Sequence, residues 1–156
     1  MITNIRKPKP ADLNYIFDID LKCFEDYLSI EGWLEYLEGN YNLLVAIVKG
    51  LPAGVVVWQD NIIQRIAVKP SNRGNGVGSQ LLQAVENSLV QKGFDLIMIN
   101  VPESMCCPGQ PHDVSHWLSE RKFLADGVQK DATLYCQQKE DLFRFTKILS
   151  EVIIHG

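Results

Sequence analysis

The chain has 156 residues, 46% of them hydrophobic, which predicts a single domain over residues 1–156 with a substantial core. Its net charge of −4 and isoelectric point near 5.3 argue against nucleic acid as the main partner and are compatible with a cationic one. No apolar run approaches membrane-spanning length and no signal-type stretch opens the chain, so we expect a cytoplasmic protein that does not bind membranes.

The N-terminal part of the chain predicts a strand and two helices. Residues 3–6 are expected to form a short strand, and a helix is expected to begin at Asp12 or just before it. Apolar residues then recur at helical spacing around the polar Asp20: Leu13, Ile16, Phe17, Leu21 and Phe24. Glu25 and Asp26 break this pattern, and a second helix is expected over residues 30–38.

Three β-rich runs follow in quick succession, over residues 42–49, 54–59 and 62–69. Gly50, Leu51 and Pro52 separate the first two runs, and Asp60 and Asn61 separate the second from the third. Because such short connections join antiparallel neighbours, the sequence predicts two hairpins in succession.

The third of these strands leads into a glycine-rich loop, Arg73-Gly-Asn-Gly-Val-Gly-Ser79, and then into a helix expected over residues 76–91. Glycines at alternate positions leave the backbone N–H groups open to a ligand's oxygens. The first turn of a helix also has unpaired N–H groups and a partial positive charge. Strand, loop and helix together therefore predict a pyrophosphate-binding site.

The residues that this loop lacks narrow the choice of ligand. A Walker loop ends in Gly-Lys-Ser/Thr, whereas Gly78 is followed here by Ser79 and Gln80. A dinucleotide fingerprint reads G-x-G-x-x-G after an early strand of a parallel sheet, whereas this loop reads G-x-G-x-G after a meander. The alternative without a ligand is a glycine-rich turn that merely begins a helix.

The remaining pattern, Arg73-x-x-Gly76-x-Gly78 after an Ile-Ala-Val strand, closely resembles the acetyl-CoA signature of the GCN5-related N-acetyltransferase (GNAT) superfamily. The expected order of elements is also the GNAT order, over most of the chain up to Val101 and more loosely up to Gln138. The resemblance implies an α/β (α+β) fold in which helices flank a mixed, mostly antiparallel central sheet. It also implies acetyl-CoA as the acyl donor.

The same resemblance implies which residues hold the donor. In GNAT proteins the loop N–H groups hold the pyrophosphate, and the edge of the preceding strand pairs with the pantetheine arm. The corresponding residues here are Ile66, Ala67, Val68, Arg73, Gly74, Asn75, Gly76, Val77, Gly78 and Ser79. A backbone N–H near Val68 would polarise the thioester carbonyl. Direct transfer to an amine requires no enzyme nucleophile, so the cysteines are not needed.

Three positions that carry acid or base residues in many relatives hold other side chains here. Leu118 stands in place of a tyrosine that protonates the departing thiolate, and Ile62 and Asn100 stand in place of glutamates. The catalytic residues of the family therefore cannot be transferred to this chain.

Replacement candidates lie in a long connection and on a late strand. Residues 101–114 contain three prolines and a glycine, which predicts a loop without helix or strand beyond the end of a strand over residues 95–101. His112 in this loop and Tyr135 on a strand expected over residues 132–138 are the candidate catalytic residues, with Glu103 and Cys106 as further possibilities. The alternatives are that Asp113 caps a following helix and that Tyr135 belongs to the core.

The remaining C-terminal residues predict a turn over residues 126–129 and an additional amphipathic helix over residues 141–154. The apolar stripe of this helix is expected to pack on its own domain, with a homodimer contact as the alternative. The four cysteines lack metal-ligand spacing, so we expect free thiols and no metal site: Cys23, Cys106, Cys107 and Cys136.

In GNAT proteins the connection between the first two helices forms one wall of the acceptor groove. Here this connection carries Glu25 and Asp26, which are expected to bind the substrate. Carboxylates at that place favour a cationic acceptor such as a polyamine, an amino sugar or a basic peptide terminus.

The sequence therefore predicts an acetyl-CoA-dependent N-acetyltransferase that acts on a primary amine of a small molecule or peptide by direct attack. The alternative is a non-catalytic acyl-CoA-binding sensor or interaction module, which the residues at positions 62, 100 and 118 favour. A dinucleotide enzyme is a more distant alternative.

Overall fold

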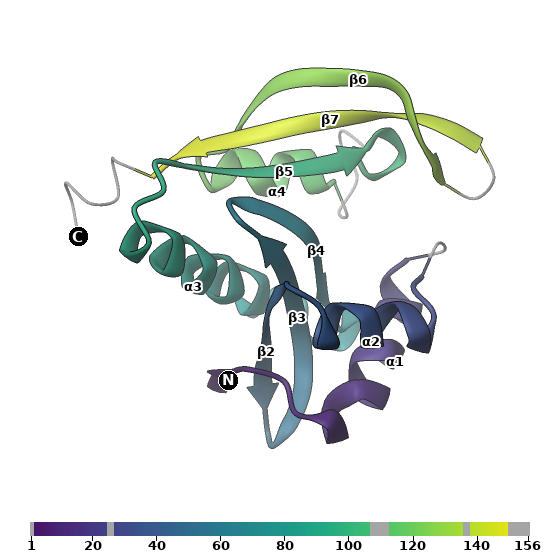
Figure 1. The fold of residues 1–156 in the computed structure, drawn as a ribbon, viewed down its shortest axis with the longest axis vertical. Helices are drawn as coiled ribbons and strands as arrows, with labels where there is room; N and C mark the ends of the chain where they lie inside the picture. The colour runs from purple at the N-terminus through teal and green to yellow at the C-terminus, as the bar shows by residue number, and fades with distance from the viewer. Residues whose placement is uncertain (1, 25–26, 107–112, 136–137, 150–156) are drawn as a thin grey trace. The chain divides into compact units, whose positions relative to one another are not determined.

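The computed structural model describes residues 2–24, 27–106, 113–135 and 138–149 (Figure 1). The chain divides into two compact units, Met1–Ser88 and Leu89–Gly156. Both units combine helices with antiparallel strands, so the predicted mixed α/β class is confirmed. Within the described ranges, no helix is both long enough and apolar enough to span a membrane.

The first unit contains four antiparallel strands in the order β1-β2-β3-β4. Their bounds are Ile2–Arg6, Asn42–Val48, Leu51–Gln59 and Ile62–Val68. The two predicted hairpins are confirmed, but the first turn is shorter than expected, because Leu51 and Pro52 belong to β3. Lys49 and Gly50 form this turn with φ angles of 52° and 83°, which suit the right-handed twist of the flanking strands.

Two helices, α1 (Leu13–Cys23) and α2 (Ile30–Glu38), pack on one face of these strands (Figure 1). A 3₁₀ turn, Pro10–Asp12, leads into α1, and the Ser29 hydroxyl caps α2 by accepting from the Gly32 N–H at 3.1 Å. Both helices bury their apolar stripes in one core: Ile16, Ile19, Trp33, Leu43, Val45, Ile47, Val55, Val57 and Ala67. The periodicity of the sequence thus placed both helices correctly.

Helix α3 (Val77–Gln91) packs on the opposite face of the same strands (Figure 1). Side chains alternate along a strand, so Gly54 faces away from the core to which its neighbour Val55 belongs. A Cβ atom at Gly54 would lie 3.0 Å from Leu81 Cδ1 and 3.0 Å from Val77 Cγ1. The absence of a side chain at Gly54 therefore allows the first turns of α3 to approach the sheet closely.

The second unit contains three antiparallel strands with β7 in the middle and β5 and β6 on its two sides. The elements of this unit are β5 (Leu96–Pro102), a 3₁₀ turn (Glu103–Met105), α4 (Val114–Glu120), β6 (Leu124–Tyr135) and β7 (Gln138–Ile148). The 3₁₀ turn lies where the sequence predicts a loop without regular structure. Asp113 caps α4, as one alternative predicts, because its carboxylate accepts from the Ser115 N–H at 3.1 Å.

Two expectations for the end of the chain are wrong. The turn expected over residues 126–129 lies inside β6, and the helix expected from Asp141 is the strand β7 as far as Ile148. Residues 150–154 of that helix lie outside the described residues. Strand β7 pairs along most of its length with both β5 and β6, and these pairings override a helical spacing of apolar residues.

The close approach at Gly54 makes the first prediction. Gly54→Ala should lower the free energy of unfolding by about 1–3 kcal/mol, the usual cost of overpacking a well-packed site. Urea denaturation with an unchanged m-value measures this difference. Gly32→Ala is the matched control: its Cβ would meet its nearest atom at 3.4 Å, so it should be neutral or stabilise α2 by about 0.5–1 kcal/mol. A Gly54→Ala protein as stable as wild type would contradict the packing.

Candidate functional site

A short loop joins β4 to α3, and two of its glycines have backbone conformations in the left-handed region. A 3₁₀ turn, Pro70–Asn72, follows the strand, and Gly74 and Gly76 then have φ angles of 80° and 81°. Among the described residues, a Cβ atom at Gly74 would meet nothing within 4 Å, and one at Gly76 would meet only Gln80 Nε2 at 4.0 Å. The backbone at both glycines is therefore open to the close approach of a ligand.

The N-terminus of α3 begins directly after this loop. The Gln80 N–H donates to the Gly76 carbonyl at 3.0 Å, which is the first hydrogen bond of the helix. The N–H groups of Val77 and Gly78 precede that bond, so they have no acceptor within the helix. Together with the positive end of the helix dipole and the exposed loop backbone, these groups fit an anion such as a diphosphate.

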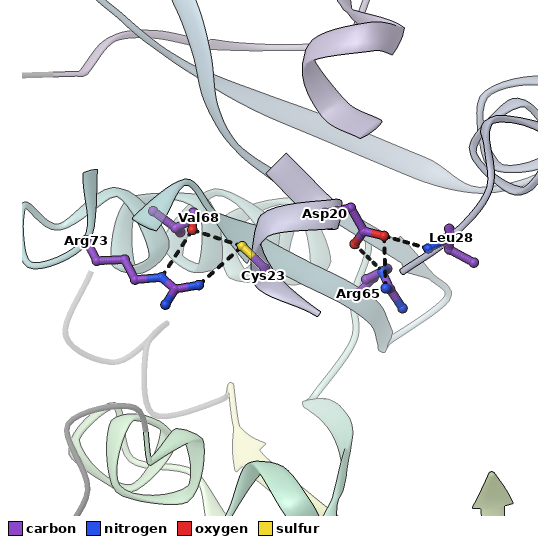
Figure 2. A network of polar contacts seen from close by, with 6 residues as sticks. All are labelled: Asp20, Cys23, Leu28, Arg65, Val68 and Arg73. Carbon is purple, nitrogen blue, oxygen red and sulfur yellow. Dashed lines mark hydrogen bonds and ion pairs between the residues drawn. The ribbon is translucent and has the colours of Figure 1, made fainter. Parts of the chain in front are cut away.

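The carbonyl of Val68, the last residue of β4, links the strand to the loop. The Lys69 N–H donates to the Ala53 carbonyl of β3 at 2.8 Å. In a trans peptide N–H and C=O point in opposite directions, so the Val68 carbonyl points away from β3. It accepts from the Cys23 thiol at 3.1 Å and from Arg73 Nε at 3.2 Å (Figure 2).

Cys23, the last residue of α1, also accepts from Arg73 Nη2 at 3.2 Å. Burial raises the pKa of the Cys23 thiol, and the hydrogen bond and charge of Arg73 offset part of that rise. The group is therefore a protonated thiol at neutral pH that links helix, strand and loop.

Asp20, one turn before Cys23 in α1, is fully buried and forms a bidentate ion pair with Arg65 of β4 (Figure 2). Arg65 Nε lies 2.6 Å from Asp20 Oδ1, and Arg65 Nη2 lies 3.0 Å from Oδ2. The Leu28 N–H donates to Oδ2 at 2.7 Å, and the Arg65 guanidinium carbon lies 4.3 Å from the centre of the Phe24 ring. These contacts bind β4 to the connection between α1 and α2.

The sequence did not identify the roles of Asp20, Arg65 and Cys23. Asp20 was visible as a polar residue in an apolar stripe, and Arg65 as a cation two residues before the buried Ala67 on the same face of β4. A charged residue at a buried position requires a partner of opposite charge, which is the signal that could have joined the two.

The residues predicted to hold the acyl donor are contiguous in the first unit. Ala67 is buried, Ile66 and Val68 are half-buried at the end of β4, and the loop from Arg73 to Gly76 is exposed. Val77, Gly78 and Ser79 form the first turn of α3, where the Val77 side chain packs inward. Donor binding by this stretch stays a prediction.

The predicted catalytic and acceptor residues are not described to the same extent. Glu25, Asp26 and His112 lie outside the described residues, and Tyr135 is described only by its backbone at the end of β6. Their assigned roles stay predictions.

The positions that depart from the family pattern have side chains without an acid or base. Leu118 is fully buried in α4, Ile62 is half-buried at the start of β4, and Asn100 is exposed on β5. Of the two further candidate catalytic residues, Glu103 is exposed and Cys106 is half-buried.

Comparisons with known proteins identify a family for this chain and solved structures with a similar fold. Residues 9–105 match the family model described as an acetyltransferase (GNAT) domain. No curated relative matches the chain in sequence.

The solved structures with a similar fold include the ribosomal-protein-S18-alanine N-acetyltransferase of Escherichia coli, with a TM-score of 0.78, 16% identity, and 94% of this chain and 93% of that chain covered. The smu.2055 protein of Streptococcus mutans has a TM-score of 0.78 and 18% identity over 94% and 99% of the chains. The putative acetyltransferase yncA of Salmonella typhimurium, solved with acetyl-CoA, has a TM-score of 0.72 and 17% identity over 94% and 93%. At sequence identities this low, the TM-scores establish a shared fold and nothing further.

The environment of Cys23 makes the second prediction. Because burial raises the thiol pKa, Cys23 should react with iodoacetamide more slowly near neutral pH than a free peptide thiol does. Arg73→Met removes a contact that lowers this pKa, so the pH–rate profile should move to higher pH. Mass spectrometry of the Cys23 peptide separates its alkylation from that of the other cysteines. A profile in Arg73→Met that stays in place or moves to lower pH would contradict the assignment.

Proposed function

The chain belongs to the acetyltransferase (GNAT) family, and we propose that it transfers an acetyl group from acetyl-CoA to a primary amine of a small molecule or peptide. The observation that carries this proposal is the open glycine loop at the N-terminus of α3, directly after β4. We propose that residues 1–156 work as one acyl-CoA-binding domain.

Acetyl-CoA supplies an acetyl group activated as a thioester, and the residues of the first unit bind and orient it. The backbone N–H groups from Arg73 to Ser79 hold the diphosphate. The outer edge of β4 at Ile66 and Val68 pairs with the amide groups of the pantetheine arm. The peptide groups of Val68 and of Ile66, two residues earlier, point away from β3, which supports this role, since a strand edge pairs only through groups that point outward. The Val68 carbonyl already accepts from Cys23 and Arg73, so Val68 would pair through its N–H.

The acceptor must lose a proton before it can attack. An alkylamine with a pKa of about 10.4 is neutral in roughly one molecule in a few thousand at pH 7. Desolvation of the amine and transfer of its proton to a nearby base lower that cost. His112 and Tyr135 are the proposed proton-transfer residues, since Leu118 is buried and apolar.

Acidic residues in the connection between α1 and α2 support a cationic acceptor. Glu25 and Asp26 are the proposed acceptor-binding residues, and their charge would attract an amine. The E. coli enzyme of similar fold is described as acetylating an alanine of ribosomal protein S18. A peptide with an N-terminal alanine therefore belongs in the acceptor panel beside polyamines and amino sugars.

A second candidate function is an acyl-CoA-binding sensor or interaction module without turnover. The residues that favour it are Ile62, Asn100 and Leu118, which provide no acid or base. Thiol release from acetyl-CoA with the amine panel distinguishes the two functions, because the module would bind CoA without releasing thiol in an amine-dependent way. A cytoplasmic location and a homodimer stay predictions.

The loop makes the third prediction. Gly76→Val should weaken CoA binding in calorimetry by about tenfold or more, which corresponds to about 1.4 kcal/mol. A branched side chain at a φ of 81° both strains the loop and covers the backbone that the diphosphate would approach.

The control for the strain alone is Gly50→Val, since Gly50 has a φ of 83° in the β2–β3 turn. This variant should lose stability to a similar degree and keep its affinity for CoA. Equal affinities of folded Gly76→Val and wild-type protein would remove the loop from the donor site.

Proton transfer makes the fourth prediction. His112→Ala or Tyr135→Phe should lower kcat by a factor of about 10²–10⁴ if that residue is the general acid or base. His116→Ala is the matched control: this histidine lies exposed on α4 with its Nε2 3.1 Å from a Glu120 carboxylate oxygen, so kcat should be unchanged. Losses of a few-fold or less in both test variants would eliminate both assignments.

A further inference from the structure

The glycine loop is anchored at its first residue by the side chain of Arg73. Arg73 Nε donates to the Val68 carbonyl at 3.2 Å, and Arg73 Nη2 donates to the Cys23 sulfur at 3.2 Å (Figure 2). Asn75, the residue between the two left-handed glycines, makes a long contact of 3.5 Å from its Nδ2 to the Asn72 carbonyl. The main side-chain anchor of the loop is therefore at its start.

Cys23 completes a closed set of hydrogen bonds around the Val68 carbonyl. Its thiol donates to this carbonyl at 3.1 Å, so Cys23 and Arg73 share one acceptor and also contact each other. A neutral thiol can donate and accept at the same time, whereas a thiolate can only accept. Burial raises the pKa of the Cys23 thiol, which keeps the donating form at neutral pH.

The peptide group that carries this carbonyl belongs to the sheet. It joins Val68 to Lys69, and the Lys69 N–H donates to the Ala53 carbonyl of β3 at 2.8 Å. One side of the peptide group is thus bound to β3, and the other side binds Cys23 and Arg73. The Arg73 side chain is therefore attached to a group whose direction the sheet determines.

The helical turn that carries Cys23 is also bound to β4. Asp20 lies three residues earlier on the same side of α1, is fully buried, and forms the bidentate ion pair with Arg65. Because this pair binds the end of α1 to the strand, the Cys23 sulfur has a defined place beside the loop. Both groups that Arg73 contacts are thus in place without a ligand.

We propose that Cys23 and Arg73 are positioning residues for the acyl donor: together they fix the first residue of the glycine loop in the conformation that receives the diphosphate. This inference rests on the proposed function, in which the loop binds the donor. It adds a residue of α1, distant from the loop in sequence, to those that determine donor affinity. A loop that is already ordered loses less conformational entropy on binding, so its ligand binds more tightly.

The test measures the Kd for CoA of the full chain by calorimetry. Cys23→Ala removes both contacts of the thiol and should raise this Kd about three- to tenfold, which is the range of one net hydrogen bond. Cys23→Ser should stay within about twofold of wild type, because a hydroxyl also donates and accepts.

Arg73→Lys separates positioning from charge. Lysine keeps the positive charge but has one nitrogen where arginine uses two, so it cannot reproduce both contacts, and the Kd should rise by about tenfold. If Arg73 acted through its charge alone, Arg73→Lys would bind CoA as tightly as wild type.

The double variant shows whether the two residues act together. Cys23→Ala/Arg73→Lys should have a Kd within about twofold of that of Arg73→Lys, because the thiol then has no guanidinium to position. Independent effects would multiply to about thirtyfold or more relative to wild type. Cys23→Val, which also lacks the hydrogen bonds of the thiol, replaces Cys23→Ala if that variant does not fold.

Leu21→Ala is the matched control, an uncharged truncation in the same turn of α1. Leu21 is 42% exposed, so its Kd for CoA should change by less than about twofold. Hydrogen exchange without a ligand reports the anchoring itself. The Lys69 N–H belongs to the same peptide group as the Val68 carbonyl, so its exchange should be at least about threefold faster in Cys23→Ala and unchanged in Leu21→Ala.

The outcomes distinguish this inference from the proposed function. A wild-type protein that does not bind CoA would refute the proposed donor site and this inference with it. If wild type binds CoA, equal Kd values in wild type, Cys23→Ala and Arg73→Lys would overturn the inference alone. Independent effects in the double variant, or unchanged exchange of the Lys69 N–H in Cys23→Ala, would overturn it as well.

Discussion

The first unit is organised around a carboxylate that has no contact with water. Asp20 is buried at 0% exposure, so its negative charge is stable there only because a guanidinium and a backbone N–H surround it. These donors belong to β4 and to the connection that follows α1, so satisfying one charge brings three segments together. Removal of the Arg65 guanidinium would leave the Asp20 carboxylate buried without an opposite charge, which typically costs about 3–5 kcal/mol.

Strand β4 makes one set of contacts through its side chains and another through its backbone. Arg65 and Ala67 face α1 and the hydrophobic core, where the arginine is held by Asp20. At the end of the strand the contacts are made by the backbone, because the Val68 carbonyl accepts from Cys23 and Arg73. The Arg65 side chain in the middle of β4 thus contacts the segment that follows α1, and the backbone at the end of β4 contacts the glycine loop.

The chemical groups around this strand suit binding and orientation better than covalent catalysis. Cys23 is a thiol whose pKa is raised by burial, and it links the helix to the loop. A protein that places a thioester beside an amine needs a site that positions both groups more than it needs a nucleophile.

The sequence by itself determined the features that depend on neighbouring residues: the bounds of α2, the hairpins of the first unit and the glycine loop before α3. Helical spacing, turn residues and glycines at alternate positions are local signals, so no distant partner was needed. Tertiary structure alone decided that residues 142–148 lie in a strand and not in a helix, because β5 pairs with them on one side and β6 pairs with most of them on the other. It also decided the roles of Asp20 and Cys23, since the partners of both lie 45 residues away in β4. A periodic pattern shows that a position is buried, but only the fold brings a compensating charge to it.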